Sequence, residues 1–208
     1  MLYNFVQAGG WGYILFTLIE QYFVKGKDLS TLYEGTLLPL QIFQYLAILE
    51  VFHIMLGLVP SGLMTTLSQV FSRVLCTYLV TSVEEVRESP FFMSMVAAWS
   101  ITEIIRYTFY ALSQFEKVPF FLLWVRYNLF WVLYPMGAGS EWFNILHSIP
   151  FFLSSRKLSF SLPNNLNFAF SFPYFLYFCL LIWPFGLYSL MSHVNKQRIS
   201  QLNKRKKD

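Results

Sequence analysis

Six runs of mostly apolar residues, each long enough to cross a membrane as a helix, dominate the sequence. A helical span needs roughly 20 such residues. Of the 208 residues 56% are hydrophobic and 12% are charged, whereas soluble domains carry roughly 25% charged residues. We therefore predict an all-α integral membrane protein, one domain over residues 1–208 built as a bundle of about six transmembrane helices. The expected spans cover residues 5–24, 37–58, 63–83, 91–112, 120–141 and 166–191.

The segments between the runs contain the expected loops. Pro150, Arg156 and Pro163 predict a loop between the last two spans, in which residues 142–153 are apolar but too short to cross a bilayer. We expect this short segment to lie at the membrane interface. Near the N-terminus, the Gly9-Gly10-Trp11-Gly12 run predicts close helix packing. Membrane strands are not expected, because the runs are long and do not alternate.

A basic tail, residues 192–208, follows the last span. It holds six of the fifteen basic residues, namely Lys196, Arg198, Lys204, Arg205, Lys206 and Lys207. Positive charge beside a span favours the cytoplasmic side, and an even number of spans places both termini on one side. We therefore predict that both termini are cytoplasmic and that the tail faces membrane lipid. Nucleic acid is not expected as a partner, because no recognition fold precedes the tail.

Several charged or titratable residues lie within the expected spans, where lipid makes them costly. They are Glu50, His53, Arg73, Glu103, Arg106 and Arg126. Glu103 and Arg106 are three residues apart, so they share a helix face and can pair. These residues indicate a functional site inside the bundle. The alternative is that they pair only to hold the helices together.

Metal and nucleotide chemistry find little support in the sequence. Glu50 and His53 form one Glu-x-x-His step, but di-iron bundles use two such steps and further carboxylates. The other histidines, His147 and His193, are far away in the sequence. We expect no metal site and no bound cofactor. The sequence also lacks a P-loop and a Gly-x-Ser-x-Gly elbow.

A tyrosine and a glutamate, Tyr134 and Glu141, stand seven residues apart in the fifth expected span. In an unbroken helix they share a face but are about 10.5 Å apart along the axis. Pro135, Gly137 and Gly139 lie between them, and we expect these residues to loosen the helix and bring Glu141 back toward Tyr134. The alternative is that Tyr134 belongs to an interfacial aromatic belt and that Glu141 faces water.

Several separate motifs resemble those of the very-long-chain (3R)-3-hydroxyacyl-CoA dehydratase family, also called the protein-tyrosine-phosphatase-like family. They are Tyr3-Asn4, Gly10-Trp11, Leu49-Glu50-Val51-Phe52-His53, Gly57-Leu58-Val59-Pro60-Ser61, Gln69-Val70-Phe71-Ser72-Arg73, Trp99-Ser100-Ile101-Thr102-Glu103-Ile104-Ile105-Arg106-Tyr107, and Arg126-Tyr127 with Tyr134-Pro135-Met136-Gly137 and Ser140-Glu141. They follow one another in the family's order, from the N-terminus toward the sixth span.

The resemblance implies a function and a location. It implies a hydro-lyase with six spans in the endoplasmic reticulum membrane, which converts 3-hydroxyacyl-CoA to trans-2-enoyl-CoA in the third step of fatty-acid elongation. The family's catalytic pair corresponds to Tyr134 and Glu141. No metal or redox cofactor is implied, and other elongation enzymes are expected partners. Arg205-Lys206-Lys207-Asp208 resembles a dilysine-type retrieval signal.

The chemistry of dehydration suggests roles but leaves alternatives. Glu141 is a candidate base for the C2 proton and Tyr134 a candidate donor to the 3-hydroxyl, and the opposite assignment stays open. Arg126, Arg106 or backbone N–H groups are candidates to stabilise the enolate-like charge. We expect a deep apolar tunnel, with Lys117 and the tail near the CoA phosphates. The rival hypotheses are a membrane scaffold for elongation enzymes and a small transporter.

Overall fold

The computed structural model describes residues 2–59, 62–115, 118–163 and 167–205. Their ordered elements are helical except for one isolated antiparallel bridge between Phe160 and Phe170, which confirms the all-α class. In chain order they are α1 (Leu2–Ile19), a π-helical continuation η1 (Glu20–Val24), a 3-10 turn η2 (Leu29–Thr31), α2 (Tyr33–Leu46), α3 (Ile48–Met55), α4 (Leu63–Ser82), α5 (Glu84–Arg87), α6 (Pro90–Ser113), α7 (Phe120–Asn128), α8 (Phe130–Ser155) and α9 (Phe172–Arg205).

Three helical segments of the described chain are long and apolar enough to cross a membrane: Tyr33–Met55, which joins α2 and α3, Leu63–Ser82, and Phe172–Gln201. The chain is therefore a multi-pass membrane protein. The other expected spans correspond to α1 with η1, to α6, and to α7 with α8. Both α6 and α8 bury polar side chains, Glu103 and Asn144 among them. The number of six spans stays a prediction.

The fifth expected span differs from the structure in its course. A break at Leu129 separates α7 from α8, and α8 continues to Ser155 rather than ending near residue 141. The expectation that residues 142–153 form part of a loop is therefore wrong. This segment stays helical because one face of it, including Ile145, Ile149 and Phe152, is buried in the core. The helix ends where Arg156 adopts a left-handed conformation with φ of 51°.

The last helix also differs from its expected bounds. Residue 166 lies outside the described residues, residues 167–171 are not helical, and α9 begins at Phe172. It then continues past residue 191 through the first part of the basic tail, as far as Arg205. A helix of 34 residues is about 51 Å long. Its C-terminal part therefore extends well beyond the thickness of a hydrocarbon core.

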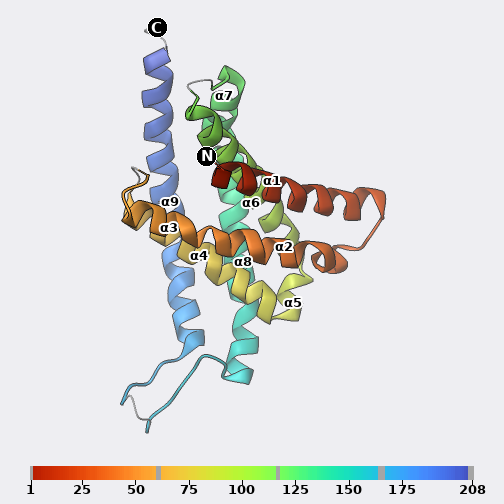
Figure 1. Ribbon diagram of the computed structural model, residues 1–208. Coiled ribbons are helices and arrows are strands. Elements are labelled where there is room, and N and C mark those ends of the chain that lie inside the picture. The colour runs from red at the N-terminus through yellow and green to blue at the C-terminus, as the bar shows by residue number, and fades with distance from the viewer. Residues whose placement is uncertain (1, 60–61, 116–117, 164–166, 206–208) are drawn as a thin grey trace.

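Packing centres on α6, which contacts α1 and α8, while α8 lies beside α9. Figure 1 shows α8 and α9 side by side and running in opposite directions, with α2 and α4 passing across them. The expected close packing at the N-terminal glycines is confirmed at Gly10, where a Cβ atom would lie 2.0 Å from Cε1 of Phe43. Only glycine lets α1 approach α2 this closely.

Candidate active site

A cavity of about 550 Å³ lies between α4, α6, α8 and α9. Apolar side chains such as Phe175, Phe178 and Ile182 form part of its wall. The cavity also brings together most of the charged and catalytic residues expected from the sequence: Glu50, Arg73, Glu103, Arg106, Tyr134 and Glu141. A mostly apolar cavity with a few converging polar groups is the usual form of a small-molecule site.

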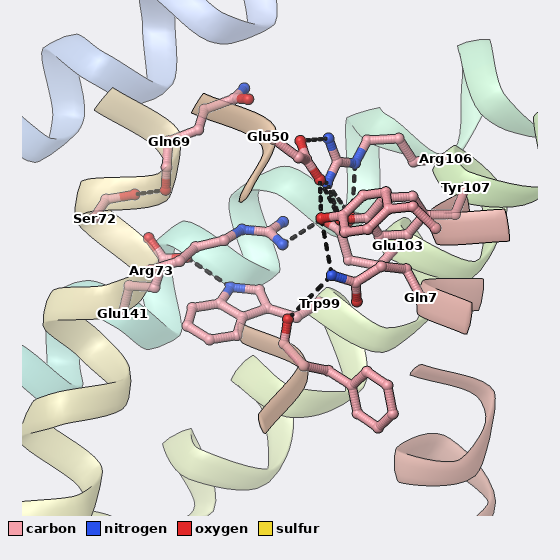
Figure 2. Close-up of polar contacts among 12 residues, drawn as sticks. Gln7, Glu50, Gln69, Ser72, Arg73, Trp99, Glu103, Arg106, Tyr107 and Glu141 are labelled. Carbon is pink, nitrogen blue, oxygen red and sulfur yellow. Dashed lines mark hydrogen bonds and ion pairs between the residues drawn. The ribbon is translucent and has the colours of Figure 1, made fainter. Parts of the chain in front are cut away.

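The carboxyl group of Glu141 lies in this cavity with both oxygen atoms bound. The indole Nε1 of Trp99 on α6 donates to Oε1 at 2.7 Å, and Nε1 of Trp183 on α9 donates to Oε2 at 3.0 Å. The Glu141 side chain comes from α8 and the residue is only 9% exposed. Two donors from two different helices therefore fix both the position and the orientation of this carboxylate (Figure 2 shows the Trp99 contact).

Tyr134 lies two turns before Glu141 on α8 and lines the same cavity. Its ring packs edge-on against Phe130, with the ring centroids 5.9 Å apart. Within the described part of the chain, the Tyr134 hydroxyl has no hydrogen-bond partner. A phenol in this setting can donate to, or accept from, a bound molecule without first leaving a protein partner.

The helix between Tyr134 and Glu141 is not broken. Pro135, Gly137 and Gly139 all lie within α8, so the expectation that they fold Glu141 back toward Tyr134 is wrong. At Gly137, which faces α6, a Cβ atom would lie 3.4 Å from Cβ of Ala98, an ordinary contact distance. The two residues keep a helical separation of about 10.5 Å along the axis.

An ion-pair network joins three helices along one side of the cavity. Arg106 on α6 contacts Glu50 on α3 at 2.9 Å and Glu103 at 2.6 Å. Glu103, which is 2% exposed, also accepts a hydrogen bond from Arg73 on α4. The sequence-based pairing of Glu103 with Arg106 is thus confirmed. Figure 2 shows Arg73 reaching across toward Glu103, and its guanidinium lies 5.2 Å from the Trp99 ring centroid.

Hydroxyl and amide groups complete the surroundings of Glu50. The Tyr107 hydroxyl donates to Glu50 Oε1, and the Tyr3 hydroxyl on α1 donates to the same atom at 3.3 Å. Nε2 of Gln7 donates in turn to the Tyr3 hydroxyl at 3.0 Å. Glu50 is therefore tied to α1 as well as to α6, and its charge is compensated by Arg106.

Two further candidates lie apart from the main cavity. His53 is not part of its lining, and its ring packs edge-on against Tyr3 with centroids 5.2 Å apart. Arg126 lines a smaller neighbouring cavity, where its guanidinium lies 4.2 Å from the Phe109 ring centroid. Tyr134 and Arg106 border both cavities. Among the residues that the structure describes, no three His, Cys, Asp or Glu side chains gather as metal ligands do.

Sequence reasoning did not assign a role to the two indoles that hold Glu141. Trp99 could have been predicted as a site residue, because it lies four residues before Glu103 and seven before Arg106, on the same helix face. Trp183 could not have been predicted from the sequence, since it contacts Glu141 only because α9 packs against α8.

Comparison with known proteins identifies the family. A model of the family described as "Protein tyrosine phosphatase-like protein, PTPLA" matches residues 44–204. This chain belongs to that family. The matched region contains Tyr134, Glu141 and the whole Glu50–Arg106–Glu103–Arg73 network. In this member of the family, these residues surround one cavity.

Relatives extend the likeness over the whole chain. Very-long-chain (3R)-3-hydroxyacyl-CoA dehydratase 2 of Homo sapiens is 40% identical over 212 residues, which cover 100% of this chain and 83% of that protein. Very-long-chain (3R)-3-hydroxyacyl-CoA dehydratase PASTICCINO 2 of Arabidopsis thaliana is 36% identical over 209 residues, covering 100% and 94%. Dehydratase 1 of Mus musculus is 34% identical over 197 residues, covering 94% and 70%. No solved structure matches the chain.

Proposed function

We propose that this chain is a hydro-lyase that dehydrates very-long-chain (3R)-3-hydroxyacyl-CoA to trans-2-enoyl-CoA, the third step of fatty-acid elongation. Relatives that carry this activity in their names match it over its full length. The observation that carries the proposal is the arrangement on α8. Glu141, held by two indole donors, and Tyr134, with a hydroxyl free of protein partners in the described structure, line one cavity.

The reaction needs two proton transfers on neighbouring carbons. A base removes a proton from C2, the C2–C3 double bond forms, and the bond from C3 to its hydroxyl oxygen breaks. An acid gives its proton to that oxygen, which leaves as water. Positioned acids and bases contribute about 10²–10⁴-fold each, so two such groups suit a cavity that contains one carboxylate and one phenol.

We assign the base to Glu141 and the acid to Tyr134. Both oxygens of Glu141 accept N–H donors, which is the pattern that favours the ionised, proton-accepting form of a carboxylate. The Tyr134 hydroxyl carries a proton, and no protein acceptor in the described residues competes for it. These contacts support the assignment, and the reverse roles remain the alternative that variants must exclude.

The unbroken course of α8 sets a condition on the substrate. The carboxylate contacts the C2 hydrogen, and the phenol contacts the hydroxyl oxygen on C3. If the C2–C3–O unit between these two contacts is extended, the carboxylate and phenol oxygens can be up to about 8 Å apart. We therefore propose that the reacting carbons lie between these two side chains.

Arg73 is the best-placed cation for the thioester oxygen. Arg106 is occupied by two carboxylates, Glu50 and Glu103. Arg73 uses Nη1 for Glu103 and lies over Trp99, which contacts Glu141. Its remaining N–H groups are available to stabilise the negative charge that develops on the thioester oxygen when C2 loses its proton.

The cellular setting is part of the proposal. We propose that the protein is in the endoplasmic reticulum membrane with both termini cytoplasmic, alongside other enzymes of the elongation cycle. The basic tail supports the cytoplasmic side. Protease protection of a C-terminal tag in sealed microsomes checks the orientation: digestion without detergent supports it, and protection contradicts it.

The test of function is direct formation of product. The full-length chain, purified in detergent, is incubated with (3R)-3-hydroxyacyl-CoA, and trans-2-enoyl-CoA is measured by mass spectrometry. A dehydratase forms the enoyl product without any other protein. A scaffold or a transporter forms none in this assay, and that result would overturn the proposal.

A further inference from the structure

Two arginines near one end of the cavity have no carboxylate partner among the described residues. The first, Arg126 on α7, lies against aromatic rings, with its guanidinium 4.2 Å from the Phe109 centroid and 4.9 Å from that of Tyr110. The second, Arg198 on α9, donates Nε and Nη2 to Oδ1 of Asn128 on α7, at 3.2 and 3.1 Å. Rings and a neutral amide hold both guanidinium groups in place without cancelling their charge.

The other arginines near the cavity differ from Arg126 and Arg198 because they have carboxylate partners. Arg73 and Arg106 each pair with at least one carboxylate. Unpaired guanidinium groups that the fold holds in place are typical of sites for phosphate, which they bind in a bidentate, charge-assisted manner. Figure 1 shows that α7 and the C-terminal part of α9 lie at the same end of the molecule.

The side chains of α9 that line the cavity change from apolar to polar along the helix. The series begins with Phe175 and Phe178, passes Trp183 opposite Glu141, and reaches the exposed His193. The smaller cavity beside Tyr134 continues in the same direction, to Val194 and Gln197 of α9 and Arg126 of α7. An apolar chain therefore fits the Phe175 side of Glu141, and a polar head group fits the side toward Arg198.

The distance between Glu141 and Arg198 matches the length of the pantetheine arm of an acyl-CoA. Arg198 follows Trp183 by fifteen residues on α9, or about 22 Å along the axis. An arginine side chain leans back toward the helix N-terminus by roughly 6 Å, which leaves about 16 Å. Thirteen covalent bonds separate the thioester sulfur of an acyl-CoA from the first phosphorus atom. Such a chain spans about 15 Å when extended.

Resting on the proposed function, we propose that Arg126 and Arg198 bind the phosphate groups of the CoA thioester. The pantetheine arm then runs past Tyr134 from the α7–α9 end to Glu141. Two lysines that the sequence places near the CoA phosphates do not form part of this site. Lys117 lies outside the described residues, and Lys196 is exposed with no described contact to the cavity.

The experiment compares two substrates of the purified full-length chain: a (3R)-3-hydroxyacyl-CoA and the matching pantetheine thioester, which has no phosphate. Arg126→Met and Arg198→Met are each expected to raise KM for the CoA thioester about tenfold, the usual effect of losing a charged hydrogen bond. KM for the pantetheine thioester should change less than twofold. Arg87→Met is the matched control, because Arg87 pairs with Glu84 and does not line the cavity.

A second measurement does not depend on the variants. For the wild-type chain, added salt should raise KM for the CoA thioester and leave that for the pantetheine thioester unchanged, since salt screens phosphate–guanidinium attraction. Equal effects of the arginine variants on both substrates, or equal salt dependence, would overturn this phosphate site while leaving the dehydratase proposal intact. Failure of the wild-type chain to dehydrate either substrate would instead overturn the proposed function on which the site rests.

Discussion

Replacing Trp99 by phenylalanine removes one N–H donor from the Glu141 carboxylate and keeps an aromatic ring in its place. The Trp99 contact of 2.7 Å and the Trp183 contact of 3.0 Å each satisfy a different oxygen of Glu141. A hydrogen bond to a charged group contributes about 1.5–3 kcal/mol, and each 1.4 kcal/mol corresponds to about tenfold. We therefore expect Trp99→Phe and Trp183→Phe each to lower kcat at least tenfold, with the larger loss at Trp99.

The pH dependence of kcat separates this effect from a general loss of structure. Two N–H donors favour the ionised carboxylate, so losing one favours its protonated form. Because the proposed base must be ionised, the activity of Trp99→Phe should begin to fall at a higher pH on the acid side than that of the wild-type chain. A change in folding alone lowers kcat without moving the profile.

The control is a third tryptophan at the same helix interface. Trp142, the residue after Glu141 on α8, donates its Nε1 hydrogen to the Leu180 carbonyl of α9 at 3.1 Å and not to the Glu141 carboxylate. Trp142→Phe therefore loses an α8–α9 hydrogen bond without altering the proposed base. If Trp99→Phe and Trp183→Phe stay within twofold of Trp142→Phe in kcat and share its pH profile, the idea that the indoles position Glu141 is refuted.

Two further predictions concern the ion-pair network and the space in the cavity. Glu103→Leu leaves Arg73 without its carboxylate partner, and we expect a loss of about 3–5 kcal/mol in the free energy of unfolding, measured by chemical unfolding in detergent. Glu20→Leu, which removes only the partly exposed pair with Lys25, should cost less than about 1 kcal/mol. Equal losses in the two variants would contradict a structural role for the network. Gly186→Leu places a side chain in open space that lines the cavity, and it should raise KM for the acyl-CoA severalfold. Gly139→Leu is the control, because its side chain also meets open space but does not line the cavity, so KM should stay unchanged. Equal KM values for these two glycine variants would show that the substrate does not pass Gly186.

The sequence predicted the helices better than their ends. Apolar runs of about 20 residues, closed by charged or proline-containing segments, predict membrane helices because lipid demands both length and apolar character. The course of α8 could not be predicted in this way. Residues 142–153 are too few to span a bilayer alone, and Pro150 usually ends a helix, yet burial of Ile145 and Phe152 keeps the segment helical. Tertiary packing decided this boundary.

The candidate site was predictable in its members but not in its contacts. Charged residues inside apolar spans are expensive, so Glu50, Arg73, Glu103 and Arg106 are visible in the sequence as a group with a role. Which of them pair across helices depends on how α3, α4 and α6 meet, and only the structure supplies that. The same holds for Glu141, whose donors come from two other helices.

The rate of trans-2-enoyl-CoA formation by Tyr134→Phe and Glu141→Ala tests the central claim most directly. It is measured at saturating (3R)-3-hydroxyacyl-CoA, per amount of folded protein purified from membranes. Each variant removes a proposed proton-transfer group, so we expect each to lower kcat by about 10²–10⁴-fold or more while the protein still accumulates. Wild-type rates in both variants would contradict the account, because the chemistry would then take place without either residue.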